Sequence, residues 1–329
     1  MHHTPELLRV ENLTTWLTTR SGVVAAVDNV SFSVKAGETL ALVGESGSGK
    51  SMTCLSLMRL LPASGRIAGG AIHLDGEDLV AKTDKGMQAV RGRGIGMVLQ
   101  DPMTSLNPLF TVEQQIGEVF RYRLGITDKA ERRRRVLEVL RQVRIPAPEE
   151  RMFSYPHQLS GGMRQRVAIA INLACSPKLL IADEPTTALD ITIQQQILAL
   201  LRDIQRETGM AIILVTHDLH AVERFSDRVA IMYAGRIVEQ GPVHDVFARP
   251  AHPYTEGLLR ALPRLGDDAE RLTLIPGQPP SLSSLPPGCR FAPRCSYAEA
   301  ACTAEYPQWF ATTTPPRRVA CRRAPERLA

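Results

Sequence analysis

The sequence lacks any apolar run long enough to cross a membrane. No run approaches the roughly 18 to 20 apolar residues that a bilayer-spanning helix needs, and residues 1–11 lack the apolar core of a signal peptide. The chain also lacks internal repeats and low-complexity tracts. We therefore expect a protein of the cytosol, unless a partner holds it at a membrane, with a single copy of its functional unit.

Aromatic residues and excess charge are also scarce. Aromatic residues make up 5% of the chain, and those near its C-terminal end form no recognisable nucleic-acid-binding module: Phe291, Tyr297, Tyr306, Trp309 and Phe310. A net charge of +5 over 329 residues is likewise weak evidence for nucleic acid as a partner. The share of apolar residues, 44%, is typical of globular proteins, and this length allows one sizeable α/β domain plus appendages.

A glycine-rich loop between a strand and a helix gives the strongest functional signal. Residues 39–43 read as a short buried strand, and residues 52–61 as a helix that Pro62 ends. The loop matches the pattern G-x-x-x-x-G-K-[ST] with Gly44, Glu45, Ser46, Gly47, Ser48, Gly49, Lys50 and Ser51, and Met52 follows it. Glycines let backbone amides turn inward around an anion, and the helix adds its positive end. We predict that these nine residues bind nucleotide phosphates, with Lys50 at the β and γ phosphates and Ser51 at Mg²⁺.

Two carboxylates at a strand end supply the expected second half of such a site. Residues 179–182 are apolar and are followed by Asp183 and Glu184. Ligands bind at the carboxyl ends of parallel strands. We therefore predict that Asp183 holds Mg²⁺ and that Glu184 orients and polarises the attacking water. Alone, such a pair is more often a cap or a surface pair; the phosphate loop upstream favours the catalytic interpretation.

A third motif opens a helix inside a charged, helix-rich stretch. Ser160 suits an N-cap, and Gly161 and Gly162 permit close approach, so the segment is either a second anion site or a plain capping turn. Residues 159–166 resemble the signature motif of the ATPase subunits of ABC transporters, with Met163 in place of the usual glutamine.

The resemblance to ABC ATPases implies roles for residues elsewhere. It implies that Gln100 contacts Mg²⁺ and the attacking water, that His217 senses the γ-phosphate and that Asp190 belongs to the D-loop. In this family each ATP lies between the phosphate loop of one subunit and the signature motif of another. The residues implied to contact the ATP held by a partner are Ser160, Gly161, Gly162 and Gln165. Since the chain carries one nucleotide-binding unit, a second ATPase subunit is implied.

Family members stack the adenine on an aromatic residue upstream of the phosphate loop. The nearby aromatic residues are Trp16 and Phe32. Phe32 alternates with Val30 and Val34 as a core-facing strand residue does. We therefore assign Trp16 to the adenine.

Three further stretches narrow the resemblance. Residues 100–108, 155–159 and 252–255 resemble the dipeptide, oligopeptide and nickel group of ABC importers, with the D subunits of bacterial dipeptide importers as the nearest likeness. This implies ATP hydrolysis that drives peptide uptake, with nickel or another small solute as the alternative cargo. The implied partners are a second and usually different ATPase subunit, two transmembrane permease subunits and an extracytoplasmic substrate-binding protein. The implied location is the cytoplasmic face of the bacterial inner membrane.

Soluble ABC ATPases form a competing class. Those that act on DNA carry a long inserted coiled coil or a zinc hook, and those that act on ribosomes carry two nucleotide domains. Neither feature is present in this sequence. We therefore expect no nucleic-acid partner.

The six cysteines divide unevenly. Cys54 and Cys175 stand alone, whereas the last forty-one residues hold Cys289, Cys295, Cys302 and Cys321. Cytosolic chains rarely keep disulfides, so this cluster points to metal. Four thiolates suit tetrahedral zinc or a four-iron four-sulfur cluster, and free thiols are the third option. The resemblance to peptide-importer ATPases implies a 4Fe-4S cluster, with Zn²⁺ as the alternative.

The predicted fold class is α/β: a P-loop NTPase core sheet of the ABC type, with an antiparallel β subdomain, an inserted helical subdomain and a Cys-rich C-terminal extension. We place the β subdomain and the first part of the nucleotide-binding core in residues 1–110. The helical subdomain with the signature motif occupies residues 111–176, and the second part of the core residues 177–250. The extension, with a Pro- and Gly-containing linker, occupies residues 251–329.

Overall fold

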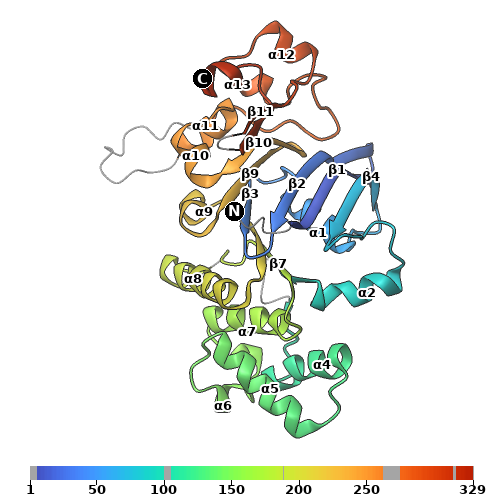
Figure 1. The fold of residues 1–329 in the computed structure, drawn as a ribbon, viewed down its shortest axis with the longest axis vertical. Helices are drawn as coiled ribbons and strands as arrows, with labels where there is room; N and C mark the ends of the chain where they lie inside the picture. Colours follow the sequence, from blue (N-terminus) through green and yellow to red (C-terminus); the bar gives the residue numbers. More distant parts are fainter. Residues whose placement is uncertain (1–5, 100–104, 188, 262–274, 314–315, 329) are drawn as a thin grey trace. The chain divides into compact units, whose positions relative to one another are not determined.

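A computed structural model describes residues 6–99, 105–187, 189–261, 275–313 and 316–328. The chain forms two compact units. Unit 1 contains residues 1–7, 35–38 and 81–215, and unit 2 contains residues 8–34, 39–80 and 216–329. Each unit has strands and helices of its own, most of which Figure 1 labels.

Unit 1 contains three parallel strands. β7 (Leu179–Asp183) lies between β6 (Ile95–Val98) and β8 (Ala211–Val215). Every residue of β7 and β8 is buried. Strands covered on both faces read as continuous apolar runs, which is why the run before Asp183 predicted this strand correctly.

Helices make up most of the rest of unit 1. They are α2 (Asp84–Arg93), α4 (Val112–Leu124), α5 (Lys129–Gln142), α6 (Pro148–Arg151), α7 (Gly161–Leu173) and α8 (Ile191–Thr208), with a 3-10 turn η1 (Pro156–Gln158). Thr111 and Gln114 form a capping box at the start of α4, and Asp128 caps α5. The stretch that the sequence predicts to be helix-rich is therefore helical.

Unit 2 begins with an antiparallel sheet in the order β2-β1-β4-β5. Its strands are β1 (Glu6–Thr19), β2 (Gly22–Lys35), β4 (Gly65–Leu74) and β5 (Glu77–Asp78). β1 continues its alternation of buried and exposed residues past Leu13 to the buried Thr15. Its pairing with β4 shifts register between Glu11 and Thr15.

A second group of strands in unit 2 runs in the order β11-β12-β10-β9-β3. β3 (Thr39–Val43) is parallel to β9 (Arg228–Tyr233), and the other pairs are antiparallel. β10 (Arg236–Pro242) pairs with β12 (Pro316–Val319), which in turn pairs with β11 (Phe310–Thr313). The C-terminal extension thus adds two strands to the sheet that contains β3, a feature that the sequence did not predict.

The helices of unit 2 are short. They are α1 (Lys50–Met58), α9 (Leu219–Phe225), α10 (Val243–Ala248), α11 (Pro253–Arg260), α12 (Ala300–Ala304) and α13 (Ala324–Leu328), with a 3-10 turn η2 (Ala292–Arg294). α1 ends three residues earlier than predicted, because Arg59 takes a left-handed conformation with φ 49° and its N–H bonds back to the last turn. Pro62 therefore lies beyond the helix end rather than at it.

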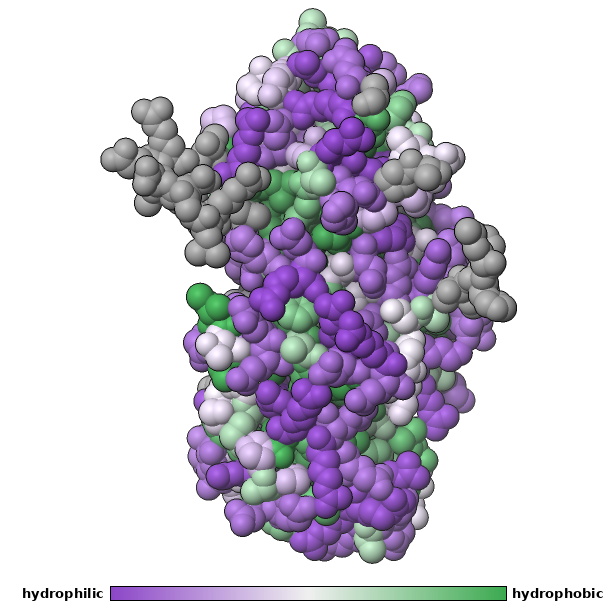
Figure 2. All heavy atoms as spheres, turned by 60° about the vertical axis from the view of Figure 1, so that its left-hand side comes forward, coloured by the Kyte–Doolittle hydropathy of each residue, from purple (hydrophilic) through white to green (hydrophobic). Residues whose placement is uncertain are grey.

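The surface is mainly polar on the face that Figure 2 shows, where apolar residues occur as small separate patches. Such scattered apolar residues are normal on a water-exposed surface. Among the residues that the structure describes, no helix combines the length and the apolar character needed to span a bilayer.

A buried ion pair fixes the extension to its sheet. Arg317 on β12 donates to the Glu239 carboxylate on β10 at 2.5 Å, and the two side chains are 3% and 0% exposed. The same carboxylate accepts from the backbone N–H groups of Ala251 and His252. Breaking such a pair leaves an uncompensated buried charge, which costs far more than the pair itself contributes.

We predict that Arg317→Met lowers the free energy of unfolding by about 3–5 kcal/mol, because Glu239 loses its counter-charge. Denaturant unfolding of the full chain measures the change. Arg134→Met is the matched control, because Arg134 makes exposed ion pairs on α5 and should change stability little. Equal stability of the Arg317 variant and the native chain would contradict this account.

Candidate functional site

The phosphate loop joins β3 to α1 within unit 2. Gly49 is the N-cap of α1 with φ 104°, a conformation that side chains other than glycine's rarely adopt. A Cβ there would lie 2.6 Å from the Ala26 carbonyl oxygen. Lys50 is 6% exposed, and its Nζ donates to the carbonyl oxygens of Gly44 at 2.7 Å and Glu45 at 3.0 Å. The loop therefore has a glycine-dependent shape at a helix N-terminus, as an anion nest requires.

Residues of the C-terminal extension, and Gly235 before it, form hydrogen bonds with this loop. The Glu45 N–H donates to the Tyr254 hydroxyl at 2.9 Å, and the Glu45 carboxylate accepts from Arg294 at 2.6 and 3.0 Å. The Gly235 N–H donates to the Ser48 carbonyl at 2.8 Å. The sequence did not single out Arg294 or Tyr254 for this role, although Tyr254 belongs to a stretch that resembles the importer group.

The two predicted carboxylates lie together in unit 1. Asp183 ends β7 and is 7% exposed. Glu184 follows with φ 47°, which is uncommon for a residue other than glycine. Its N–H donates to the Val215 carbonyl at 2.9 Å, and its carboxylate accepts from the Thr187 hydroxyl at 2.9 Å. The backbone turn at Glu184 is thus fixed from two sides.

The signature segment opens α7 in the same unit. The Ser160 hydroxyl accepts from the Met163 N–H at 3.3 Å, so Ser160 is the N-cap of α7. A Cβ at Gly162 would lie 2.8 Å from the Ile193 side chain, which explains a glycine there by close packing on α8. Gln165 is buried, with 1% exposure. Asp190 caps α8 through the Ile193 N–H at 2.9 Å.

These contacts are the ones that a plain capping turn would make. They leave the exposed start of α7 suited to an anion as well. The contact of Ser160, Gly161, Gly162, Gln165 and Asp190 with a nucleotide stays a prediction.

Four further residues assigned from the sequence have different outcomes. His217 follows β8 and is exposed. Trp16 lies on β1, is 36% exposed, and has the Arg66 guanidinium 4.8 Å from its ring centroid. Phe32 is buried at 4% exposure, which confirms that it is a core residue. Gln100 lies outside the described residues, and the roles of His217 and Trp16 stay predictions.

The four clustered cysteines line one small cavity in unit 2. Cys289, Cys295, Cys302 and Cys321 share a space of about 30 Å³ with His252, Phe291 and Tyr297. Burial raises the pKa of the Cys289 thiol to about 11 and also raises the pKa values of Cys295 and Cys321, and neighbouring thiols add to the effect. Cys54 and Cys175 are buried elsewhere.

A metal in this cavity stays a prediction. Within the described residues, no group of three or more His, Cys, Asp or Glu side chains is arranged to hold a metal ion. The donor set nevertheless fits the implied group in its chemistry, because four thiols facing a mostly enclosed cavity are the ligands of zinc or of a 4Fe-4S cluster.

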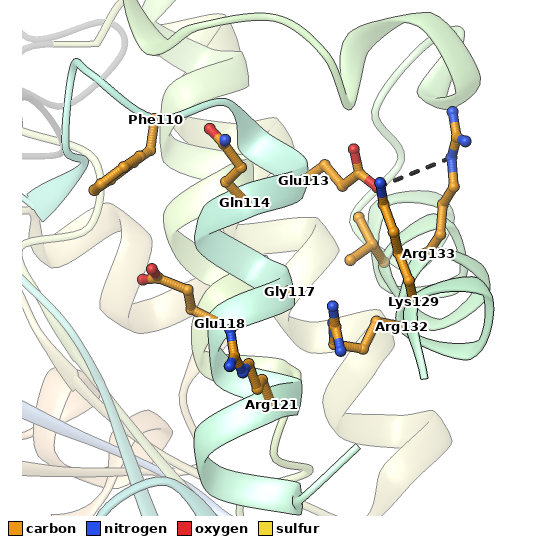
Figure 3. Close-up of a pocket in the computed structure, with 10 residues that line it drawn as sticks. Phe110, Glu113, Gln114, Gly117, Glu118, Arg121, Lys129, Arg132 and Arg133 are labelled. Carbon is orange, nitrogen blue, oxygen red and sulfur yellow. Dashed lines mark ion pairs between the residues drawn. The ribbon is translucent and has the colours of Figure 1, made fainter. Parts of the chain in front are cut away.

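An open cavity of about 320 Å³ lies between α4 and α5 in unit 1 (Figure 3). Basic and acidic side chains line it together: Glu113, Glu118, Arg121, Lys129, Arg132 and Arg133. Arg133 lies 3.9 Å from Glu113, the ion pair that Figure 3 marks. The residues predicted to contact ATP do not line this cavity, so it is distinct from the candidate site.

Comparison with known proteins identifies the class. The family model described as ABC transporter matches residues 27–187. The dimeric ATP-binding cassette MJ0796 in a post-hydrolysis state bound to ADP and Pi has a similar fold, with a TM-score of 0.64, 31% identity and coverage of 72% of this chain and 98% of that one. CbiO1 of Clostridium perfringens, part of the CbiONQ ABC transporter complex, also has a similar fold, with a TM-score of 0.64 and 33% identity. The match covers 74% of this chain and 91% of CbiO1. The chain belongs to the ABC transporter family of ATP-binding proteins.

The C-terminal part narrows this assignment. The model for the C-terminal region of oligopeptide/dipeptide transporters matches residues 238–302. A protein of Brucella melitensis, provisionally named a peptide import ATP-binding protein, is 51% identical over 304 residues, which cover 92% of this chain and 91% of the relative. One of Brucella ovis with the same kind of name is 53% identical over 313 residues, with 92% of each chain covered. The resemblance to peptide-importer ATPases is therefore confirmed over nearly the whole chain.

We predict that Gly49→Ala weakens MgATP binding about tenfold or more, because the added Cβ forces the loop away from the Ala26 carbonyl and a cost of about 1.4 kcal/mol is a factor of ten. Calorimetric titration of the full chain measures the affinity. The matched control is Gly69→Ala, since a Cβ at Gly69 meets nothing within 4 Å. Unchanged affinity in Gly49→Ala would contradict the proposed loop geometry.

Proposed function

We propose that this chain is the ATP-binding and ATP-hydrolysing subunit of a membrane importer of peptides. The observation that carries the proposal is the presence in one chain of a phosphate loop with anion-nest geometry and a C-terminal region of the oligopeptide/dipeptide transporter type. The names of the Brucella relatives support peptides as the cargo. No observation favours nickel or another small solute.

In this proposal the phosphates of ATP bind to the loop amides and to Lys50, at the N-terminus of α1. Mg²⁺ would be held by oxygen donors of Ser51, Asp183 and Gln100, which are the hard ligands that this ion prefers. When bound, it neutralises phosphate charge. Glu184 orients and polarises the attacking water, and His217 contacts the γ-phosphate. The fixed backbone turn at Glu184 supports this role, because a water-activating carboxylate must be held in one position.

The proposed site is completed by a second subunit. The start of α7, with Ser160, Gly161 and Gly162, offers a capped helix end to the nucleotide of a partner ATPase subunit, and Asp190 faces the same partner. The assignment of Gln165 to that nucleotide rests on the resemblance alone, because its side chain is buried at 1% exposure. Two such chains close around two ATP molecules and drive the permease subunits. The remaining proposed partners are two transmembrane permeases and an extracytoplasmic binding protein, which place the chain at the cytoplasmic face of the inner membrane.

We predict that Glu184→Gln leaves MgATP binding intact and nearly abolishes hydrolysis, because the amide cannot accept the proton of the attacking water. ATP turnover and uptake of labelled peptide are measured in the complete transporter reconstituted in vesicles. Glu207→Gln, an exposed change on α8, is the matched control, and it should keep native rates of ATP turnover and peptide uptake. Native ATP turnover by Glu184→Gln would contradict the role assigned to this residue. If the native transporter takes up no peptide, the assignment of peptides as the cargo is wrong.

We further propose that Cys289, Cys295, Cys302 and Cys321 hold a 4Fe-4S cluster. The presence of all four thiols in the lining of one cavity supports this, because four cysteine thiolates are the ligands of such a cluster. A zinc ion is the alternative for the same donors. The cavity contains none of the predicted ATP contacts, so we assign the group a structural or regulatory role.

We predict that the chain purified without oxygen is brown and holds about four iron atoms, the content of one such cluster. Visible absorption and elemental analysis measure this, and Cys302→Ser should lose both signals. Cys175→Ser, a buried cysteine outside the cavity, is the control that keeps them. A colourless, iron-free chain with zinc, or with no metal, would exclude the cluster.

A further inference from the structure

Every polar group of Glu45, the second residue of the phosphate loop, bonds to another part of unit 2. Its N–H donates to Tyr254, its carbonyl oxygen accepts from Lys50, and its carboxylate accepts two hydrogen bonds from Arg294. Two of these three partners belong to the C-terminal extension. Glu45 is therefore the point at which the extension contacts the loop.

Arg294 is held rigidly on the side of the extension. It is the last residue of η2, lies between Cys289 and Cys295 in sequence, and its side chain is 5% exposed. Its Nε donates to the Pro276 carbonyl at 2.8 Å. Its guanidinium lies 5.8 Å from the ring centroid of Tyr233 and 6.0 Å from that of Phe291. A planar guanidinium with two parallel bonds fixes both the position and the orientation of a carboxylate.

Tyr254, held by aromatic packing, makes the second contact of the extension with the loop. Tyr254 packs against Tyr233 and Phe291, with ring centroids 4.6 and 5.4 Å away, and its hydroxyl accepts from the Glu45 N–H. Phe291 immediately precedes η2 and lines the cysteine cavity. Tyr254 and Arg294 each adjoin in sequence a residue that lines the cavity, Pro253 and Cys295, and both bond to the same loop residue.

We propose that Arg294 is a positioning residue for nucleotide binding and acts through Glu45. Its two hydrogen bonds keep the start of the loop in the shape that directs the following amides at phosphate. The positive charge of Arg294 balances the Glu45 carboxylate. Without it, the carboxylate would repel the phosphates, and this repulsion is stronger where water is partly excluded. The inference rests on the proposed function in one respect, that residues 44–51 bind nucleotide.

The test is calorimetric titration of the full chain with MgADP, which separates binding from hydrolysis. Arg294→Gln should weaken MgADP binding about tenfold, because the loop loses its anchor and the Glu45 carboxylate loses its counter-charge. Arg294→Lys keeps the charge but makes one contact in place of two, so its loss should be smaller. In the double variant Glu45→Gln with Arg294→Gln, removal of the unbalanced carboxylate should recover only part of the affinity, because the two positioning hydrogen bonds stay lost.

Arg317→Gln is the matched control. Arg317 also forms a buried ion pair between the extension and the rest of unit 2, but with Glu239 and not with the loop. Both single variants should unfold at lower temperature, whereas Arg317→Gln should keep its MgADP affinity within twofold of the native chain. This separates loss of loop positioning from general loosening of the extension.

The outcomes are distinct. MgADP affinity of Arg294→Gln within twofold of native, an equal loss in Arg317→Gln, or full recovery in the double variant overturns the proposal. If Arg294→Gln does not fold, Arg294→Lys carries the test, and native affinity in that variant overturns the proposal. A native chain that binds no MgADP contradicts the proposed function itself.

Discussion

The backbone of the phosphate loop is the constraint on which the proposed function depends. Its turn at Gly49 is open only to glycine, because the φ of 104° and the Ala26 carbonyl both exclude a side chain. That turn places the loop at the N-terminus of α1, where aligned amides and the helix dipole favour an anion. Fixed amides need not reorganise when phosphate arrives, so the loop can bind charge that water would otherwise solvate.

The C-terminal extension is part of the structure that holds this loop. It adds β11 and β12 to the strands that include β3, and the Arg317–Glu239 pair fixes it there. Arg294 and Tyr254 bond to Glu45, and each directly adjoins in sequence a residue that lines the cysteine cavity. Any group that orders the cysteine segment would therefore also order the contacts behind the loop, which gives a physical reason for a cysteine-rich appendage on a nucleotide-binding chain.

The sequence predicted features that depend on local pattern. The loop motif, the buried run of β7, the N-cap at Ser160 and the core position of Phe32 all follow from residues close together in the chain. Contacts between distant segments were not predictable: Glu45 and Arg294 are 249 positions apart, and no periodicity links them. The end of α1 at Arg59 was missed because proline was taken as the stop, whereas the left-handed residue ends the helix. The roles of Gln100, His217 and Trp16 came from resemblance alone and remain predictions.

The central claim is that residues 44–51 bind the phosphates of ATP. The most direct measurement is equilibrium binding of MgATP to the purified full chain and to Lys50→Ala, with circular dichroism to show that both are folded. The account predicts one nucleotide bound per native chain, and at least a hundredfold weaker binding, about 2.7 kcal/mol, when the buried cation is removed. A folded Lys50→Ala chain that binds MgATP as tightly as the native chain would contradict it.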